Sequence, residues 1–457
     1  MRNGEAETIA ELLADWIVTV EADRLPPASI ESCRKLFLDV AGLCVSARRE
    51  VYVAATLDAV EPGACTAIGH ARGVDAFGAA LINGAAAHGE DYDDTFEGGP
   101  VHSGAVIIPA VLAICEREKL SGPHALEAIA VGVELLCRLS LVAPKAVHKA
   151  GFHPTAVFGA MAAAGAVAKA LNLGQAQTVS AFGIAGSMAS GIIEYLAEGT
   201  WTKRMHAGWA AQSGIRAALM ARGGFLGPRT VFEGAHGFYR AFAPSVSPNF
   251  APLLDKIGEK WLLESIAFKP YACGTMTQPF IDCAIALAAQ GVRADDIDGI
   301  VCEVGEGTVH RLWEPLSVKH KPPTPYAAKF STPFCMAIGF LDGKAGLAQF
   351  TEERIADPET QTLASKIRYE INPEDPYPNN FTGHLRAALK NGEVREIRQP
   401  HMRGGVHEPL TVAQIETKCT DNALYGGWTL EQASVLRDTS KFIFMAPSLT
   451  ALQHFRD

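Results

Sequence analysis

The sequence predicts a mostly α-helical protein with an α+β domain inserted into the chain. Three observations support this fold class. Apolar residues recur with helical spacing in the first third, strand-like alternation appears only after about residue 268, and helical spacing returns after about residue 405. The simplest architecture is a large helical domain built from residues 1–267 and 405–457 and a smaller α+β domain built from residues 268–404. With 457 residues, the chain is long enough for two such domains.

The first helices are predicted from apolar spacing and from proline. Six apolar residues between Ile9 and Val20 form one stripe of a helix, and Pro26 and Pro27 end that helical stretch. Ser29 is then expected to cap a second amphipathic helix. From about residue 75 to residue 224 the chain is rich in alanine and glycine, which predicts closely packed, buried helices separated by loops.

The inserted domain is predicted from alternation and from one turn. The stretches IDGIVCEVG and KIRYEIN alternate like strands, and Asn391-Gly392 between two strand-like arms is a strong hairpin signal. After residue 405, the stretches TVAQIETKCTDNALYGGW and TLEQASVLRDTS again have helical spacing.

Charge and composition exclude several classes of partner. The net charge is −10, whereas nucleic acids and anionic membranes are bound through clustered Lys and Arg, so neither is an expected partner. No apolar run approaches the length of a membrane helix, and the acidic, amphipathic start differs from a secretory signal, so a cytoplasmic protein is expected. Ten scattered cysteines without a C-x-x-C pair indicate reduced thiols rather than a structural metal site or disulfides.

A first polar cluster lies in the segment HGEDYDDTFEGGPVHSG. It contains Asp91, Asp93, Asp94, Thr95 and His102, and the Gly-Gly-Pro turn could bring the imidazole back to the acids. A carboxylate beside an imidazole orients the ring and raises its basicity, as a general base requires. The alternative is that the acids cap a helix and the histidine fills a polar niche. Because no H-x-x-x-H pair is present, no metal is expected.

Two further clusters lie at predicted helix starts. His153 precedes Pro and Thr at the start of a small-residue helix, where free backbone N–H groups suit an anion. Lys203, Arg204 and His206 stand together between two apolar stretches. Removing a proton beside a carboxylate creates a dianionic, enolate-like state, and nearby cations stabilise that charge. In both cases an ordinary helix start, with solvated charges, is the alternative.

A fourth group, FKPYACGTMTQPF, contains Lys269 and Cys273 near the predicted domain boundary. Cys273 could be a nucleophile by residue type, but no local Cys-His signature accompanies it, and a packed thiol is the simpler interpretation. The fragment GEGTVHRLW lacks the third glycine and the context of a dinucleotide site, so no nucleotide cofactor is predicted.

The motifs DYDDTFEGGPVHSG, GFHPTA, GIAGSMASGIIEYLAEGTWTKRMHAGWAA, GGFLGPRTVFEG and FKPYACGTMTQPFIDCA, in this order, closely resemble the MmgE/PrpD family. That family includes 2-methylcitrate dehydratase, cis-aconitate decarboxylase and iminodisuccinate epimerase. The resemblance covers nearly the whole chain. It implies a helical domain with a smaller, lid-like α+β domain, a homodimer, and activity without the iron-sulfur cluster of aconitases or any other cofactor.

The resemblance also implies site residues. The implied pocket residues are Asp91, Thr95, His102, His153 and Lys203, with Tyr326 as a further candidate from the α+β domain. We add Arg204, His206, Lys269 and Gln278 as candidate substrate-binding residues. Gln278 stands where dehydratases and decarboxylases of the family usually carry His, and an amide cannot exchange a proton at neutral pH.

The predicted function is that of a metal-independent lyase or isomerase acting on a small di- or tricarboxylate. We expect His102 and His153 to act as acid and base, Asp91 to orient a ring, and Lys203 to hold carboxylates. A dehydratase-like lyase is the first expectation. An iminodisuccinate epimerase-like or cis-aconitate decarboxylase-like enzyme is the alternative, and Gln278 favours chemistry outside the two lyase types. An inactive binding or scaffold protein is the alternative of another class.

Overall fold

The computed structural model describes residues 6–457 and divides the chain into two compact units. The helical unit comprises the described chain up to Gly89, Asp93–Ile266 and Val412–Asp457, and the second unit comprises Glu90–Tyr92 and Ala267–Thr411. The predicted fold class, mostly α with an α+β part, is confirmed. The units change at residues 266/267 and 411/412, where the sequence suggested 267/268 and 404/405, and the short Glu90–Tyr92 segment joins the second unit.

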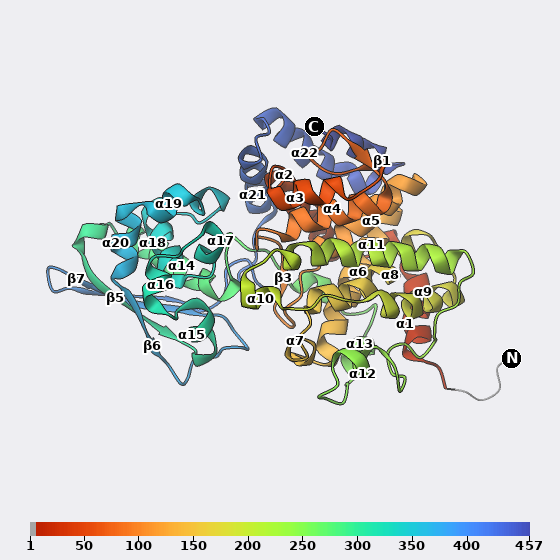
Figure 1. Cartoon of the computed structure of the whole chain (residues 1–457), viewed down its shortest axis with the longest axis horizontal. Coiled ribbons are helices and arrows are strands. Elements are labelled where there is room, and N and C mark those ends of the chain that lie inside the picture. The colour runs from red at the N-terminus through yellow and green to blue at the C-terminus, as the bar shows by residue number, and fades with distance from the viewer. Residues whose placement is uncertain (1–5) are drawn as a thin grey trace. The chain divides into compact units, whose positions relative to one another are not determined.

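The helical unit consists of packed helices with a small β-ribbon (Figure 1). Its α-helices are α1 (Ile9–Thr19), α2 (Pro27–Ser46), α3 (Val51–Asp58), α4 (Ala76–His88), α5 (Gly104–Glu118), α6 (Gly122–Val142), α7 (Ala146–Lys149), α8 (Pro154–Ala170), α9 (Gln175–Met188), α10 (Tyr195–Glu198), α11 (Thr202–Arg222), α12 (Phe238–Phe242), α13 (Ala251–Leu254), α21 (Val412–Tyr425) and α22 (Leu430–Phe442). Its short 3-10 helices are Ala22–Arg24, Leu262–Ser265, Ile443–Met445 and Leu449–Phe455. Strands β1 (Pro62–Thr66) and β2 (Gly73–Val74) pair antiparallel, and β3 spans Thr95–Phe96.

The alanine- and glycine-rich stretch forms the centre of this unit, as its composition predicts. Helix α8 is buried along its whole length and packs against α6 and α11. Helices α4 and α11 also pack together, and Gly84 and Gly208 lie where they meet, since a Cβ on either residue would overlap with the other helix. Small residues therefore let these axes approach closely, and this contact fixes the start of α11 against the end of α4.

Both helices predicted at the N-terminus are present, but the first ends at Thr19 rather than at Pro26 and Pro27, and the predicted cap of the second is wrong. Helix α1 matches the predicted apolar stripe, and Thr8 caps it in a capping box with Glu11. The prediction that Ser29 caps the next helix is wrong, because α2 already begins at Pro27 and Ser29 lies inside it. Proline is suited to the first turn of a helix because its missing N–H would have no partner there.

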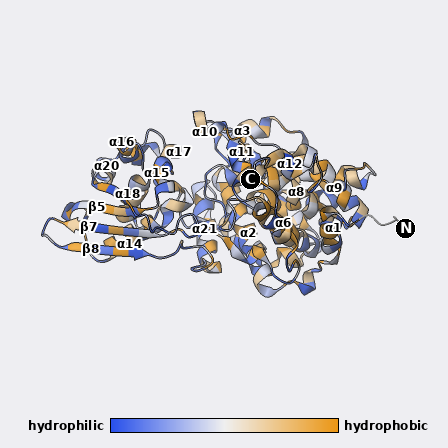
Figure 2. Cartoon of the chain, turned by 90° about the horizontal axis from the view of Figure 1, so that it is seen from below, coloured by the Kyte–Doolittle hydropathy of each residue, from blue (hydrophilic) through white to orange (hydrophobic). Residues whose placement is uncertain are grey.

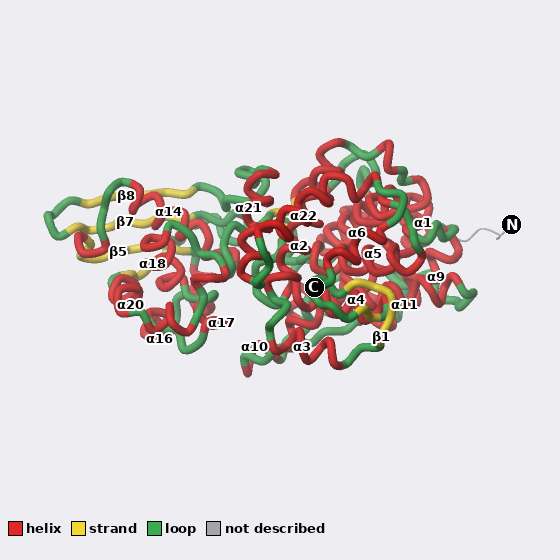
Figure 3. The backbone as a smooth tube through the Cα atoms, turned by 90° about the horizontal axis from the view of Figure 1, so that it is seen from above, coloured by secondary structure: helices red, strands yellow, loops and turns green. Residues whose placement is uncertain are grey.

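The second unit is built around a four-stranded sheet, whose strands appear as a yellow layer beside red helices in Figure 3. The strands are β5 (Ile297–Val304), β6 (Ile367–Ile371), β7 (Gly383–Leu389) and β8 (Val394–Gln399), in the order β6-β5-β7-β8, and β4 (Ile266–Ala267) lies where this unit begins. Its α-helices are α14 (Gln278–Ala289), α15 (Glu306–Leu312), α16 (Leu316–His320), α17 (Pro325–Ala328), α18 (Thr332–Asp342), α19 (Glu352–Ala356) and α20 (Pro358–Ser365), with 3-10 helices at Thr275–Thr277, Ala294–Asp296 and Leu347–Gln349.

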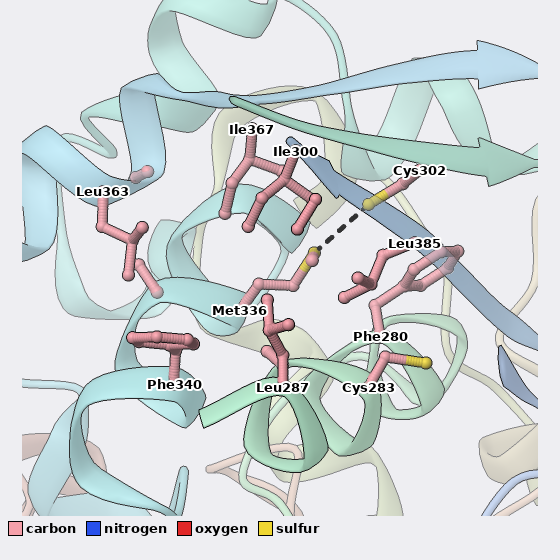
Figure 4. Packing of buried hydrophobic residues seen from close by; sticks show 14 of the residues in the cluster. Phe280, Cys283, Leu287, Ile300, Cys302, Met336, Phe340, Leu363, Ile367 and Leu385 are labelled. Carbon is pink, nitrogen blue, oxygen red and sulfur yellow. Dashed lines mark hydrogen bonds between the residues drawn. The ribbon is translucent and has the colours of Figure 1, made fainter. Parts of the chain in front are cut away.

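The strand predictions are confirmed. β5 and β6 pair in parallel, and β7 and β8 form the antiparallel hairpin predicted from Asn391-Gly392, with Gly392 at a positive φ of 85°. Hydrophobic and hydrophilic residues alternate along the strands (Figure 2), so that one face of the sheet is buried. Figure 4 shows that core, in which Ile300, Ile367 and Leu385 from the sheet pack against Leu287 of α14 and Met336 of α18.

Among residues 6–457, no helix has both the length and the apolar character that crossing a bilayer requires.

Candidate active site

Four histidines from separate elements meet inside the helical unit. His88 ends α4, His102 precedes α5, His153 is the residue just before α8, and His206 lies near the start of α11. The ring centroid of His88 lies 5.0 Å from that of His102 and 5.4 Å from that of His153, and the His153 and His206 centroids are 5.3 Å apart. We call these four residues the histidine cluster. The sequence analysis named three of them, His102, His153 and His206, as candidate site residues, but it did not single out His88.

The backbone holds His153 in place from a neighbouring loop. The N–H of His153 donates to the carbonyl of Gly191 at 2.8 Å, and the N–H of Ile193 donates to the carbonyl of Gly151 at 3.0 Å. Gly191 has a φ of 122°, and a Cβ there would meet Ala156. Only glycine fits this close approach without strain. The two hydrogen bonds and this contact hold the loop before α10 beside His153.

Two buried aspartates have different tasks in the cluster. The Asp93 carboxylate lies 2.7 Å from Nδ1 of His88 and 3.7 Å from Nδ1 of His102. The Asp94 carboxylate accepts hydrogen bonds from the N–H groups of Ser103 and Gly104 at the start of α5, as the capping interpretation suggested. Burial raises the pKa of Asp94, and the neighbouring Asp93 and Asp39 charges raise it further.

The tautomer of His102 follows from its hydrogen bond to the backbone. Nδ1 of His102 lies 2.7 Å from the carbonyl oxygen of Asp94, which can only accept. Nδ1 therefore carries the proton, and Nε2 is the nitrogen that gains or loses a proton in chemistry.

Two rings of the cluster are held neutral near pH 7. Burial lowers the pKa of His153 well below its usual value, and the nearby charges of His88, Lys203, His206 and His102 lower it further. Burial, His88 and Lys203 lower the pKa of His206 to about 4. The two Nδ1 atoms of His153 and His206 are 3.2 Å apart, a distance that requires one ring to donate to the other. Neutral, buried imidazoles are suited to accept a proton.

The other predicted residues of the helical unit are placed as follows. Lys203 lies in the first turn of α11, close enough to affect the pKa of both His153 and His206. Arg204 stacks its guanidinium over Tyr52, 4.4 Å from the ring centroid. Thr95 is buried in β3. Lys203 is thus associated with the histidine cluster, and Arg204 stacks on aromatic rings.

Asp91 lies in a second polar group, within the second unit. Its carboxylate accepts a hydrogen bond from the Tyr326 hydroxyl at 2.8 Å, and its carbonyl oxygen accepts one from Nζ of Lys269 at 3.0 Å. Lys329, which the sequence interpretation missed, is 2% exposed and pairs with the Glu90 carboxylate at 2.6 Å. The segment Glu90–Tyr92 is thereby fixed by two buried lysines, and Asp91 has a positive φ of 54°.

Gln278 lies in the interior of the second unit at the start of α14. Its side-chain N–H₂ donates to the carbonyls of Tyr271 and Cys273 at 3.3 Å each, while Oε1 is buried without a hydrogen-bond partner. The residue therefore holds the turn ahead of α14. Sequence reasoning had placed it among the substrate-binding residues, and that role stays a prediction.

One set of side chains could hold a metal ion. His88, Asp93 and His102 each offer a ligand atom, and these atoms lie within 4.8 Å of one another. Two imidazoles and a carboxylate suit a divalent transition metal. The search for an H-x-x-x-H pair in the sequence could not find this set, because it comes from the end of one helix and the loop that follows.

The fold and this site define an acid–base enzyme, since buried neutral imidazoles beside carboxylates and a lysine are what proton transfer at carbon requires. Residues 11–251 match the MmgE/PrpD N-terminal domain, and residues 271–434 match the MmgE/PrpD C-terminal domain. The chain belongs to the MmgE/PrpD family, as the motifs predicted, and its function is of the lyase type.

Three relatives illustrate the similarity. The chain is 31% identical to cis-aconitate decarboxylase of Homo sapiens over 362 residues, which cover 76% of this chain and 72% of that protein. It is 27% identical to cis-aconitate decarboxylase of Aspergillus terreus over 444 residues, covering 90% and 88% of the two chains. It is 32% identical to a cis-aconitate decarboxylase-like protein of Aspergillus oryzae, covering 91% and 90%.

Proposed function

We propose that this enzyme removes carbon dioxide from a small unsaturated tricarboxylate of the cis-aconitate type, with proton transfer at the histidine cluster. The observation that carries the proposal is the gathering of four imidazoles beside Asp93 and Lys203 in the interior of the helical unit. The similarity to cis-aconitate decarboxylases over most of the chain supports this reaction ahead of the dehydration that the sequence first suggested.

Decarboxylation requires a proton donor. The bond between the carboxylate carbon and its neighbour breaks, carbon dioxide leaves, and the electron pair stays on the substrate, so one proton must be delivered in return. His102 is the proposed donor, because the Asp94 carbonyl fixes Nδ1–H and leaves Nε2 to carry the transferred proton. Lys203 is proposed to bind a remaining carboxylate and to stabilise the negative charge that develops.

The neutral His153 suits the first step of the two alternative reactions. In dehydration and in epimerisation, a carbon-bound proton beside a carboxylate is removed before a hydroxide leaves or the proton returns. A buried imidazole with a lowered pKa is unprotonated near pH 7 and can accept that proton. Which of the three products forms depends on the substrate's leaving group, so products must be identified directly.

The test is to incubate the chelator-treated protein in deuterated buffer with cis-aconitate and with hydroxy- and amino-substituted di- and tricarboxylates, followed by proton NMR. We expect loss of carbon dioxide from cis-aconitate, with one deuterium in the product. Loss of water or inversion at carbon, with cis-aconitate untouched, would replace the proposal with the hydro-lyase or epimerase alternative. Deuterium exchange into none of the acids would favour a protein that only binds.

Substitutions assign the roles. We expect H102Q to lower kcat for decarboxylation by about 10²- to 10⁴-fold, the usual contribution of a general acid or base, whereas H153Q should cause such a loss only if the reaction is dehydration or epimerisation. H236Q is the matched control, because His236 is an exposed histidine of the same unit. Turnover by H102Q equal to that of H236Q would remove His102 from the reaction. Loss of turnover on chelator treatment that added divalent metal restores would instead assign His88, Asp93 and His102 to a metal site.

The proposal includes a cytoplasmic homodimer. All ten cysteines are buried and unpaired, which is in keeping with a reducing compartment. Sedimentation of the purified protein and fractionation of the source cells test the two parts separately.

A further inference from the structure

The segment Glu90–Tyr92 connects a histidine of the cluster to its carboxylate partner along the chain. Gly89 follows His88 at the end of α4, and Asp93 follows the segment. Nδ1 of His88 lies 2.7 Å from the Asp93 carboxylate, a distance at which the ring N–H donates to a carboxylate oxygen. Residues 88–93 thus form a short loop whose two ends are hydrogen-bonded to each other inside the helical unit.

The middle of this loop is held by residues of the second unit, to which it belongs. Nζ of Lys329 donates to the Glu90 carbonyl at 2.7 Å and to the Glu90 carboxylate at 2.6 Å. The Tyr92 hydroxyl donates to the carbonyl of Pro270 at 3.1 Å. The first and the last residue of the segment are therefore both bound by the α+β unit.

Asp91 stands at the centre of the loop with a left-handed backbone. Its φ of 54° is one that a residue with a side chain rarely adopts and keeps only where surrounding contacts hold it. Those contacts are the hydrogen bonds that Tyr326 donates to its carboxylate and Lys269 to its carbonyl oxygen. The loop therefore has a fixed conformation rather than the freedom of an ordinary surface turn.

Lys329 differs from the other partners of the loop. Tyr326 and Lys269 are candidate pocket residues, so that substituting them would change substrate binding as well. The ammonium of Lys329, by contrast, donates twice to Glu90, and the residue is 2% exposed. A buried ion pair is strongly disturbed when one partner is removed, because the other charge is left in a poorly solvating interior. Glu90 is therefore expected to move when Lys329 is replaced.

The loop leads directly into the residues that hold the proposed proton donor. The Asp93 carboxylate lies 3.7 Å from Nδ1 of His102, and the Asp94 carbonyl lies 2.7 Å from the same nitrogen. Because peptide bonds are planar and only two residues intervene, a movement of Glu90 is passed on to Asp93 and Asp94. A misplacement of about 1 Å at a catalytic group can cost about 10²-fold in rate.

We propose that Lys329 is a positioning residue for proton transfer, which acts by holding Glu90 and with it the loop that carries Asp93 and Asp94 to the histidine cluster. The inference rests on the proposed function, since it concerns the same reaction. A lysine that only stabilised the α+β unit would affect unfolding but not the hydrogen bond between Asp93 and His88.

The kinetic test uses K329M, which removes the ammonium, and E90Q, which keeps the size of the side chain but removes its charge. K366M is the matched control, because Lys366 also lies in the second unit and its ammonium donates to two carbonyls, those of Ala294 and Ile297. For cis-aconitate we expect kcat to fall by about 10- to 10²-fold in K329M and by less in E90Q, whereas K366M keeps the kcat of the unmodified enzyme. KM should change by less than about twofold, because Lys329 does not hold the substrate.

Proton NMR of the enzyme without substrate supplies a readout that a purely structural role would not move. The Nδ1–H proton of His88, bound to a buried carboxylate, should give a signal far downfield of the amide region that is absent in H88Q. We expect this signal to shift or broaden in K329M and E90Q and to be unchanged in K366M. Should K329M fail to fold, E90Q carries the test.

Three results would overturn the inference. Equal kcat for K329M, E90Q and K366M would leave Lys329 a residue of the fold alone. A lower kcat with an unchanged His88 signal would mean that Lys329 acts by another route, and a changed signal with an unchanged kcat would mean that the loop does not position the reacting groups. Absence of turnover of every acid by the unmodified enzyme would instead overturn the proposed function, and the part of Lys329 in proton transfer with it, whereas the NMR comparison would still show whether Lys329 holds the loop.

Discussion

The lowered pKa of His206 predicts a specific loss of stability in mild acid. The residue is 5% exposed, and burial, His88 and Lys203 lower its pKa from 6.5 to about 4. In the unfolded chain the pKa of the imidazole is near 6.5. Between pH 4 and pH 6.5, therefore, the ring binds a proton in the unfolded state but not in the folded state. The stabilisation from the neutral ring is therefore complete above pH 6.5 and is lost as the pH falls toward 4.

The size of the effect follows from the two pKa values. Each pH unit inside the window changes the free energy of unfolding by about 1.4 kcal/mol, and the change is smaller near the edges of the window. Between pH 7 and pH 5, His206 alone should lower the free energy of unfolding by about 2 kcal/mol.

His206→Gln is the perturbation, because glutamine does not titrate and its amide can still hydrogen-bond to His153. Urea unfolding at pH 7 and pH 5, followed by circular dichroism, gives the pH-dependent loss for each protein. We expect this loss to be about 2 kcal/mol smaller in the variant than in the unmodified protein. H236Q, at an exposed position, should behave as the unmodified protein. Equal losses in all three proteins would refute the assignment of a depressed pKa to His206.

Three other substitutions test the packing behind the site. Arg138→Met should lower the free energy of unfolding by about 3–5 kcal/mol in urea, because it leaves the buried Glu134 carboxylate without its cation, and adding Glu134→Leu should recover part of the loss. Gly84→Ala should lower both Tm and kcat, because the new methyl group overlaps with Gly208 and separates α4 from α11; unchanged values would mean that the helices adjust freely. Lys329→Met should cost on the order of 3 kcal/mol in thermal unfolding, whereas a loss near zero would show that its ion pair is replaced by solvent.

Much of the fold was predictable because its signals are local. The stripe that forms α1, the alternation that forms β5 and β6, and the Asn391-Gly392 turn of the hairpin each depend on neighbouring residues. The prediction that Ser29 caps a helix was wrong because two local signals conflict. A serine favours the cap position, which would start the helix after Ser29, whereas Pro27 favours the first helical position, which starts it earlier. Only the packed structure shows which of them prevails.

The candidate site was predictable by residue type and less so by arrangement. His102, His153, Lys203 and His206 attract attention because each is polar in an apolar, glycine-rich stretch. His88 has no such signal, since a histidine at the end of a helix is ordinary, yet it stacks on His153 and binds Asp93. Its part in the cluster depends on contacts between segments about 65 residues apart in the chain.

The sequence by itself determined the family, the order of helical and strand-forming segments, and the residue types available for proton transfer, because these depend on local spacing and on motifs. Tertiary structure decided which carboxylate accompanies which ring. Asp93, rather than Asp91, is bound to His88, and Asp91 joins Tyr326 in the second unit. It also decided that His153 and His206 are neutral, since a pKa depends on burial and on the sum of nearby charges, and both exist only once distant segments have packed together.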